Sequence, residues 1–336
     1  MLAAVIHGPK NIRLEEIKKP QLEDEEVLIR VNAAGICGSD IHIWEGDLEV
    51  HYPLVPGHEC CGHVVQVGER DMTLKEGDRA VVQPNFGCTS CYLCRMGKDN
   101  LCPSKVRLGV DIDGCFAEYV KAPARYVWPI PDEISDQQGA MVEPLAVAVR
   151  AVRKMGNPLG KRVLLLGGGP IGLLTLQLAK QAGAAVILAD LVEERLALGR
   201  KLGACEVLDV NKYDLTKRVM WLTKGEGIDV VIEAAGAIQT VELAVEVVRP
   251  GGVIVLVGLP HGTVSIPPTR IVRKEIEIRG SIIYSYDDFR QSVRLISEGM
   301  IDVDSLITHK FPLKDIGKAF DVLTTERKGI KIIVKP

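Results

Sequence analysis

RVLLLGGGPIG, residues 162–172, is the stretch that decides the fold of this 336-residue chain. An apolar run typical of a buried strand leads into Gly167, Gly169 and Gly172, spaced G-x-G-x-x-G, and then into the helix-like LLTLQLAKQAG. In this setting the first glycine allows a tight turn, the second lets a pyrophosphate approach the backbone, and the third lets helix and strand pack closely. The stretch therefore predicts the phosphate-binding turn of a dinucleotide-binding domain.

Asp190 ends the next predicted strand, AAVILAD. An acidic side chain at that strand end can hold both ribose hydroxyls of NAD and would repel the 2′-phosphate of NADP, so NAD is the expected cofactor. Arg195 follows on the next predicted helix. It either covers the adenine face or remains a solvated surface charge.

Strands and helices alternate regularly around this motif. Strands are expected near 162–167, 185–190, 205–209, 228–233, 252–257 and 275–281, with helical patterns between them. Crossovers of this length build a parallel, doubly wound sheet with helices on both faces. The fold class is therefore α/β, with a six-stranded Rossmann domain over residues 149–283. Residues 1–148 predict an irregular β-rich domain punctuated by Gly and Pro, and residues 284–336 are expected to return to it.

Four cysteines recur closely in CTSCYLCRMGKDNLC, at Cys88, Cys91, Cys94 and Cys102. Four thiolates can close a tetrahedron around zinc, and the short polar lobe at about 86–104 has little apolar core of its own. We therefore predict a structural zinc. An iron–sulfur cluster would fit the same ligands, and four unrelated surface thiols are the remaining alternative.

A second set of candidate ligands is scattered along the first part of the chain. Cys37 follows the strand-like EVLIRVNAAG, His58 and Glu59 lie in PGHE, and Glu143 interrupts the apolar helical pattern of MVEPLAV. Thiolate, imidazole and carboxylate are all zinc ligands, and a catalytic zinc keeps an exchangeable position. The first three would anchor such a zinc, with Glu143 bound directly or through water. Taken one at a time, these residues also fit ordinary roles: Cys37 as a core thiol, His58 as a loop histidine and Glu143 as half of an ion pair.

Charge and hydropathy exclude several classes of partner. Lys and Arg number 41 against 44 Asp and Glu, and the net charge of -3 argues against a nucleic-acid surface. No apolar stretch has the length of a membrane span, and the first residues, MLAAVIHGPKNIRLEE, lack the features of a signal peptide. The expectation is a cytoplasmic protein with neither a nucleic-acid nor a membrane partner.

GICGSDIH, PGHEC, the four-cysteine lobe, VEPLAV, GGGPIG with AD at the following strand end, and THKFPL occur in this order. With this set the chain resembles the medium-chain zinc-dependent alcohol dehydrogenases, in particular their branch of sorbitol, threonine and sugar-alcohol dehydrogenases. The resemblance implies a GroES-like catalytic domain, two zinc ions per subunit, and a homodimer or homotetramer. It also implies that Cys37, His58, Glu59 and Glu143 surround the catalytic zinc.

The same resemblance implies roles for further residues. Ser39 would hydrogen-bond the reacting hydroxyl and His42 would pass protons to solvent through the cofactor ribose; alternatively, both cap the turn after Cys37. Further residues expected against the cofactor are Ile171, Val257, Gly258, Leu259, Ser281, Ile282 and Ile283. The expected reaction is the NAD-linked oxidation of a secondary hydroxyl on a small polyol, sugar alcohol or sugar acid to a ketone.

The substrate is less constrained than the reaction. The sorbitol enzymes carry a tyrosine and an arginine where this chain has Ile43 and Ile283, and each lost hydrogen bond would weaken polyol binding by about 1 to 3 kcal/mol. Sorbitol is thereby disfavoured, and L-threonine and short diols stay open as alternatives. Of other classes, a zinc-free quinone reductase disagrees with Cys37, His58 and Asp190, and a non-catalytic NAD-binding protein would not need an intact ligand set.

Overall fold

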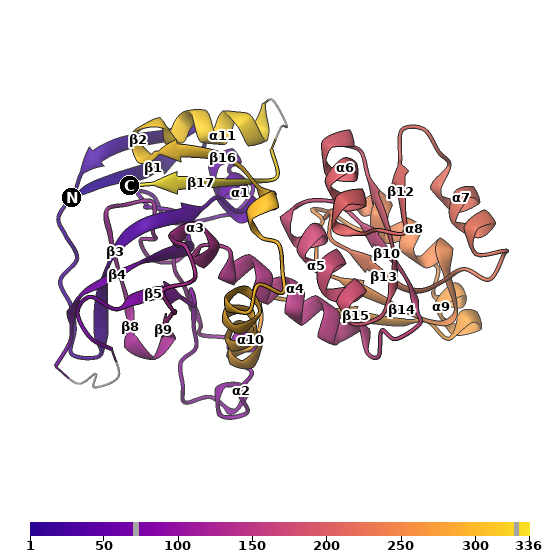
Figure 1. Ribbon diagram of the computed structural model, residues 1–336, viewed down its shortest axis with the longest axis horizontal. Coiled ribbons are helices and arrows are strands. Elements are labelled where there is room, and N and C mark those ends of the chain that lie inside the picture. The colour runs from indigo at the N-terminus through magenta and orange to yellow at the C-terminus, as the bar shows by residue number, and fades with distance from the viewer. Residues whose placement is uncertain (70–73, 326–328) are drawn as a thin grey trace. The chain divides into compact units, whose positions relative to one another are not determined.

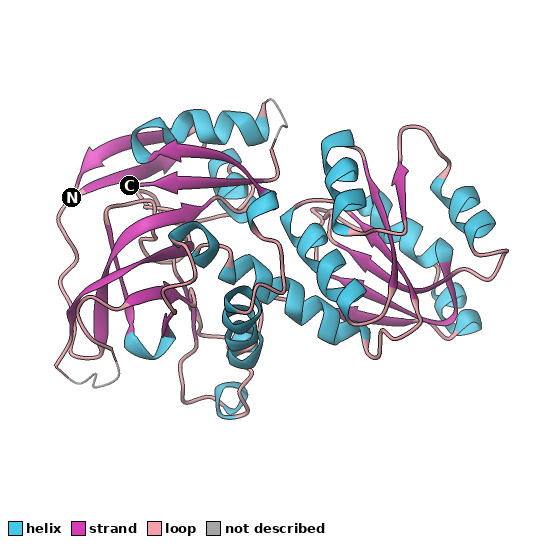
Figure 2. Cartoon of the chain, in the orientation of Figure 1, coloured by secondary structure: helices cyan, strands magenta, loops and turns pink. Residues whose placement is uncertain are grey.

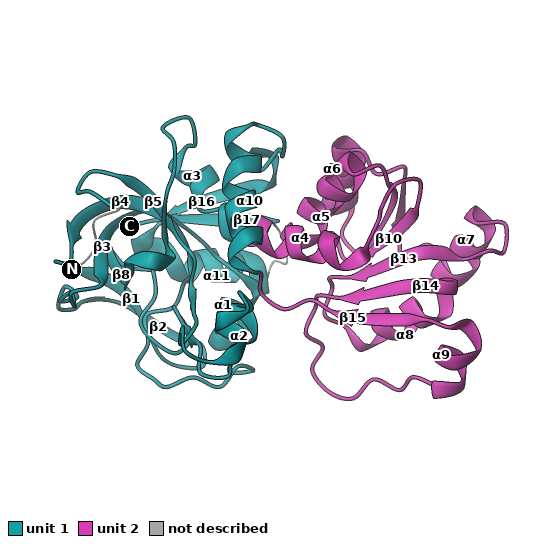
Figure 3. Ribbon diagram, turned by 90° about the horizontal axis from the view of Figure 1, so that it is seen from below, with its two compact units in different colours: residues 1–143, 285–336 teal, residues 144–284 magenta. Residues whose placement is uncertain are grey.

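The structure is a computed structural model and describes residues 1–69, 74–325 and 329–336. The chain forms two compact units, a first unit of residues 1–143 with 285–336 and a second unit of residues 144–284 (Figure 3). The first division falls just inside helix α4 (Val142–Met155), slightly before the boundary expected at 148. The second falls after Tyr284, beside the boundary expected at 283. No helix among the described residues is long and apolar enough to span a bilayer.

A six-stranded parallel sheet forms the centre of the second unit, in the order β12-β11-β10-β13-β14-β15 (Figure 1). The strands are β10 (Arg162–Leu166), β11 (Ala185–Asp190), β12 (Glu206–Asp209), β13 (Ile228–Glu233), β14 (Val248–Leu256) and β15 (Glu277–Gly280). Helices flank both faces (Figure 2): α5 (Pro170–Gln181), α6 (Glu193–Leu202), α7 (Leu215–Leu222), α8 (Ile238–Val247) and α9 (Pro268–Lys274). Both faces are covered, so the middle residues of the central strands are apolar and charged residues lie toward the strand ends, and the predicted Rossmann sheet is confirmed.

One strand of this sheet starts earlier than the sequence predicts. β14 begins at Val248 rather than at 252, because Val248 already pairs with Ile228. The register shifts between this pair and the next one, Val230 with Val253, and the shift accommodates the turn residues that follow Val248 within the strand. A bulge of this kind lets Pro and Gly lie inside a strand that the sequence pattern would begin only after them.

The first unit is built on a mixed seven-stranded sheet. Its order is β16-β17-β3-β4-β5-β9, with β8 pairing with β3. The strands are β3 (Glu26–Gly35), β4 (Glu59–Val67), β5 (Arg79–Val82), β8 (Tyr119–Pro123), β9 (Val127–Pro129), β16 (Ile307–Pro312) and β17 (Lys331–Lys335). β17 runs antiparallel to β3, so the last strand of the chain is hydrogen-bonded beside one of the first.

Shorter elements complete the first unit. Two small antiparallel pairs are β1 (Leu2–Gly8) with β2 (Asn11–Glu16) and β6 (Asn85–Phe86) with β7 (Val106–Arg107). Its helices are α1 (Gly38–Glu45), α2 (Tyr92–Arg95), α3 (Asp136–Gly139), α10 (Tyr286–Ser297) and α11 (Ile316–Thr324). Phe320 of α11 meets Phe116 edge to face in the core, with ring centroids 6.4 Å apart. The C-terminal segment thus shares one hydrophobic core with the N-terminal part of the chain.

Candidate functional site: two sulfur-containing metal sites and a dinucleotide-binding edge

The four lobe cysteines converge in the structure. One ligand atom from each of Cys88, Cys91, Cys94 and Cys102 lies within 4.8 Å of the others. The backbone N–H of Cys91 donates to the sulfur of Cys88, and that of Cys88 to the sulfur of Cys102, each at 3.4 Å. The Ser90 hydroxyl and the Cys91 N–H lower the pKa of Cys88 to about 6. Because N–H donors stabilise a thiolate, this cluster fits a metal held by four sulfur ligands.

Cys37, His58 and Glu59 also come together, and strand pairing is the reason. Cys37 directly follows β3 and its continuation at Ile36, whereas His58 and Glu59 lie at the start of β4, which pairs antiparallel with β3. Gly35 is the register partner of Glu59, and a Cβ at Gly35 would lie 2.1 Å from a Glu59 carboxylate oxygen. One ligand atom from each of the three candidate ligands lies within 4.8 Å of the others. The donor set fits zinc.

The surroundings of His58 favour a positive charge. Its Nδ1 lies 3.6 Å from Asp40 Oδ1. Burial alone would lower the pKa of His58, but the Asp40 carboxylate and the Cys37 thiolate outweigh it and raise the pKa well above its ordinary value. The negative charges that stabilise a proton on this imidazole also attract a metal cation. This electrostatic preference agrees with metal binding by the converging side chains.

Three other predicted residues lie around this cluster but outside it. Ser39 lies beside a candidate ligand, with its Oγ 3.5 Å from His58 Nε2. His42 is partly exposed on α1, and its Nδ1 lies 3.7 Å from Asp47 Oδ2. Glu143 is buried in the first turn of α4 and is not one of the three converging ligands. The structure therefore groups three of the four predicted ligands of the catalytic zinc.

The three glycines of the predicted phosphate-binding turn have the backbone geometry and surroundings that their predicted roles require. Gly167 has φ +106, in the left-handed region, and a Cβ there would lie 2.8 Å from the Ala235 backbone nitrogen. A Cβ at Gly172 would lie only 1.9 Å from the carbonyl oxygen of Gly167. A Cβ at Gly169, by contrast, would meet nothing within 4 Å. Open space beside this backbone at the start of α5 is what a pyrophosphate would require. Ile171 lies in the first turn of the same helix.

Asp190 is tied to the glycine loop. Its Oδ2 accepts the N–H of Gly168 at 2.5 Å, and its Oδ1 accepts the N–H of Val192 at 2.8 Å. Arg195 Nη1 lies 3.8 Å from Asp190 Oδ2. The buried carboxylate at the end of β11 thus has a structural role in addition to any contact with a ribose.

The remaining predicted cofactor residues follow β14 and β15 at the carboxyl edge of the sheet. Val257, Gly258 and Leu259 come directly after β14, and Leu259 is exposed. Ser281, Ile282 and Ile283 come directly after β15. The Ser281 hydroxyl is buried without a hydrogen-bond partner among the described residues, which suits a polar group of a bound ligand. Ile283 has φ +55, a rare conformation for a β-branched residue and one that concentrates at ligand sites.

Two models of protein families match the chain. The alcohol dehydrogenase GroES-like domain matches residues 23–132, and zinc-binding dehydrogenase matches residues 170–298. Among curated relatives, an L-threonine 3-dehydrogenase of Bacillus licheniformis is 37% identical, covering 98% of this chain and 96% of its own length. A sorbitol dehydrogenase of Ovis aries is 34% identical, covering 99% of this chain and 96% of its own. The chain belongs to the medium-chain zinc-dependent alcohol dehydrogenases.

The fold of this dehydrogenase agrees with that of its relatives. A zinc-binding dehydrogenase of Sinorhizobium meliloti 1021, solved bound to NADP, superposes with a TM-score of 0.94 at 33% identity over 100% of this chain and 99% of the other. Members of the family are oxidoreductases, so the chain is an enzyme of that class. The predicted family and fold class are confirmed.

Two residues that contact the group of Cys37, His58 and Glu59 in this dehydrogenase were not predicted from the sequence. Asp40 is fully buried; its carboxylate accepts the backbone N–H of Cys37 at 2.9 Å and that of Gly57 at 3.1 Å. It therefore joins the two segments that carry the ligands. The sequence signal was the acidic residue in the GICGSDIH motif, but its partner Gly57 lies in another segment of the chain.

The second missed residue is Lys331 of β17. Its Nζ donates to both carboxylate oxygens of Glu59, at 2.7 and 2.5 Å, and to the carbonyl of Ile36 at 3.0 Å. Burial alone would lower the pKa of Lys331, but the Glu59 and Cys37 charges raise it above its ordinary value. The sequence feature that could have predicted this ion pair is the lysine at the start of the strand-like KIIVK, because a buried ammonium requires a buried anion.

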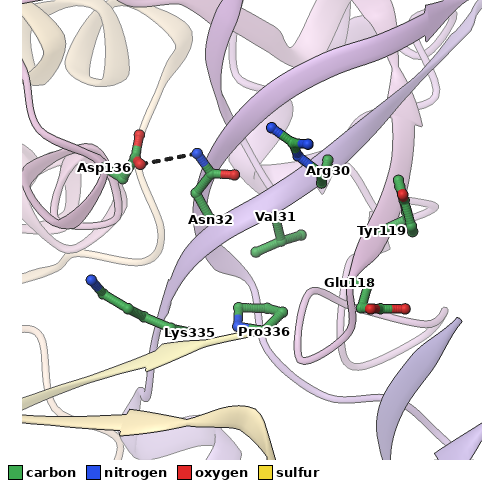
Figure 4. Close-up of a pocket in the computed structure, with 8 residues that line it drawn as sticks. All are labelled: Arg30, Val31, Asn32, Glu118, Tyr119, Asp136, Lys335 and Pro336. Carbon is green, nitrogen blue, oxygen red and sulfur yellow. Dashed lines mark hydrogen bonds between the residues drawn. The ribbon is translucent and has the colours of Figure 1, made fainter.

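Other features of the first unit lie apart from these predicted residues. Ile43 is fully buried and packs against Ile6 and Val110. A surface pocket lies over β3, where Asn32 donates to Asp136 at 2.9 Å (Figure 4). None of the predicted metal or cofactor residues lines it.

Proposed function

We propose that the protein is a zinc-dependent, NAD-linked dehydrogenase that oxidises a secondary hydroxyl of a small polyol, sugar alcohol or sugar acid to a ketone. The observation that carries the proposal is the convergence of Cys37, His58 and Glu59 in surroundings that favour a cation. The open backbone at Gly169 and the carboxylate of Asp190 support the cofactor half of the proposal. We further propose a homodimer or homotetramer, which sedimentation equilibrium would measure.

The roles of the residues follow from this proposal. Cys37, His58 and Glu59, with Glu143 directly or through water, would hold a catalytic zinc, and the four lobe cysteines would hold a structural one. A bound catalytic zinc supplies Lewis acidity, which favours loss of a proton from a hydroxyl. Ser39 would hydrogen-bond that hydroxyl, a role that its position beside His58 supports. His42, partly exposed and near Asp47, is suited to exchange the proton with solvent.

Replacing Asp190 by alanine should weaken NAD binding more than NADP binding. The variant loses the carboxylate that would bind the ribose hydroxyls and repel a 2′-phosphate, so the KM for NAD should rise by about 10- to 100-fold. The KM for NADP should rise less, because the removed repulsion offsets part of the loss of the loop contacts to Gly168 and Val192. Steady-state kinetics with both cofactors measures the ratio. An unchanged ratio would mean that another residue sets cofactor preference.

The substrate is best tested with a panel. NAD⁺ reduction, followed by the absorbance of NADH, should be measured with polyols, sugar acids, phosphorylated polyols, L-threonine and short diols. We expect turnover with one group and its loss after removal of zinc by a chelator, since the metal supplies the acidity that the hydroxyl requires. Turnover unaffected by complete removal of the metal would contradict the proposed role of zinc.

L-Threonine is the second candidate substrate. It is favoured by the 37% identity to an L-threonine 3-dehydrogenase over nearly the whole chain. Exclusive turnover of L-threonine in the panel would replace the polyol assignment, while leaving the proposed metal and cofactor chemistry in place.

A further inference from the structure

Glu233 is a buried carboxylate with no role in the chemistry described above. It ends β13 and its side chain is fully buried. Its Oε1 accepts three hydrogen bonds, from the N–H of Ala235 at 2.9 Å, the N–H of Gly236 at 2.8 Å and the hydroxyl of Thr240 at 2.7 Å. A single carboxylate oxygen therefore holds the turn that joins β13 to α8. Bonds from several donors to one charged acceptor are stronger than bonds between neutral groups.

The same residue holds the segment after the neighbouring strand. The backbone carbonyl of Glu233 accepts the N–H of Val257 at 2.9 Å and that of Gly258 at 3.1 Å. A Cβ at Gly258 would lie 2.3 Å from the nitrogen of Gly236 and 2.6 Å from Oε2 of Glu233. Only glycine fits at 258, because Glu233 and the turn after it occupy that space.

The turn braced by Glu233 also borders the glycine loop. Ala234 donates its N–H to the carbonyl of Leu166 at 2.8 Å, and the absent Cβ of Gly167 would lie 2.8 Å from the nitrogen of Ala235. The carboxyl ends of β10, β13 and β14 are neighbours in the sheet, so the turn held by the Glu233 side chain lies against the segments that follow β10 and β14.

We propose that Glu233 is a positioning residue that presets the Val257–Leu259 segment for the nicotinamide half of the dinucleotide. The inference rests on the proposed NAD site. In the second unit, Asp190 braces the glycine loop from β11, and Glu233 braces the two loops on the other side of β10. In this proposal, Asp190 supports the loops that bind the adenosine half of the dinucleotide, and Glu233 supports the loops that bind its nicotinamide half.

The test compares two ligands in the full-length protein, by titration calorimetry with NADH and with AMP. Glu233→Gln keeps the size of the side chain but removes the charge that three donors share. We expect the Kd for NADH to rise about tenfold and the Kd for AMP to stay within about twofold of wild type, because AMP needs only the Asp190 half. Thr240→Val, which removes one of the three donors, should raise the Kd for NADH by about threefold and serves if the first variant fails to fold. The control is Glu206→Gln, at the start of β12 and paired with Arg218, which should change neither Kd.

Three outcomes would overturn the inference. Wild-type affinity for NADH in folded Glu233→Gln would show that the brace does not act on the cofactor. Equal losses for NADH and AMP would indicate general loosening of the unit rather than positioning of one half. A wild-type protein that binds no NADH would overturn the proposed cofactor and, with it, this inference, whereas the first two outcomes leave the cofactor intact.

Discussion

Replacement of Cys37 by serine is expected to abolish dehydrogenase activity and to lower the zinc content by one ion per chain. Cys37 is one of the three ligands that converge at the end of β3, and serine offers only a poor substitute for a thiolate. Loss of Lewis-acid catalysis removes several kcal/mol of stabilisation from the transition state, so kcat/KM should fall by at least about a thousandfold. Metal analysis and steady-state kinetics on the best substrate of the panel measure both effects.

The fold should survive this change, because the four lobe cysteines form a separate cluster. The matched control is Cys205→Ser, a free cysteine exposed in the second unit, which should keep both zinc ions and full activity. Wild-type turnover in Cys37→Ser with both metals retained would refute the assigned site. Equal loss in the Cys205→Ser control would instead point to general damage from removing a thiol.

Replacement of Lys331 by methionine is expected to have the largest effect on stability. Glu59 would keep its charge in a site where it is only 1% exposed, without the ammonium that contacts both of its oxygens. Breaking a buried ion pair by removing one partner costs about 3 to 5 kcal/mol. The free energy of unfolding of the zinc-depleted protein should fall by this amount, as measured by denaturant titration.

Zinc should restore part of the lost stability, because a cation bound by Glu59 compensates the charge that Lys331 leaves unpaired. The control is Lys335→Met on the same strand, where the lysine is exposed and its loss should change the unfolding free energy by no more than about 0.5 kcal/mol. If Lys331→Met is as stable as Lys335→Met in the zinc-depleted protein, the ion pair is not a stabilising element.

Local sequence patterns determined the family, the Rossmann sheet and the position of the glycine loop. A parallel strand that is buried on both faces is a continuous apolar run, and the turn that follows β10 needs glycine at set positions. Both features lie within a few residues of one another, so they can be recognised without any long-range contact. The four lobe cysteines were predictable for the same reason. The start of β14 was not, because its pairing with Ile228 overrides the turn preference of Pro250 and Gly251.

Tertiary structure alone decided how charged side chains are paired around the candidate sites. Lys331 meets Glu59 across 272 residues of sequence, because β17 pairs with β3 and β3 pairs with β4. Ile43 packs inward against Ile6 and Val110, because the position of a residue on helix α1, and not the spacing of the motif, decides where its side chain points. In the sequence, Glu233 can be recognised only as the last residue of an apolar strand pattern. Its partners come from the turn after it, from α8 and from the segment that follows β14, and they come together only once the sheet has formed.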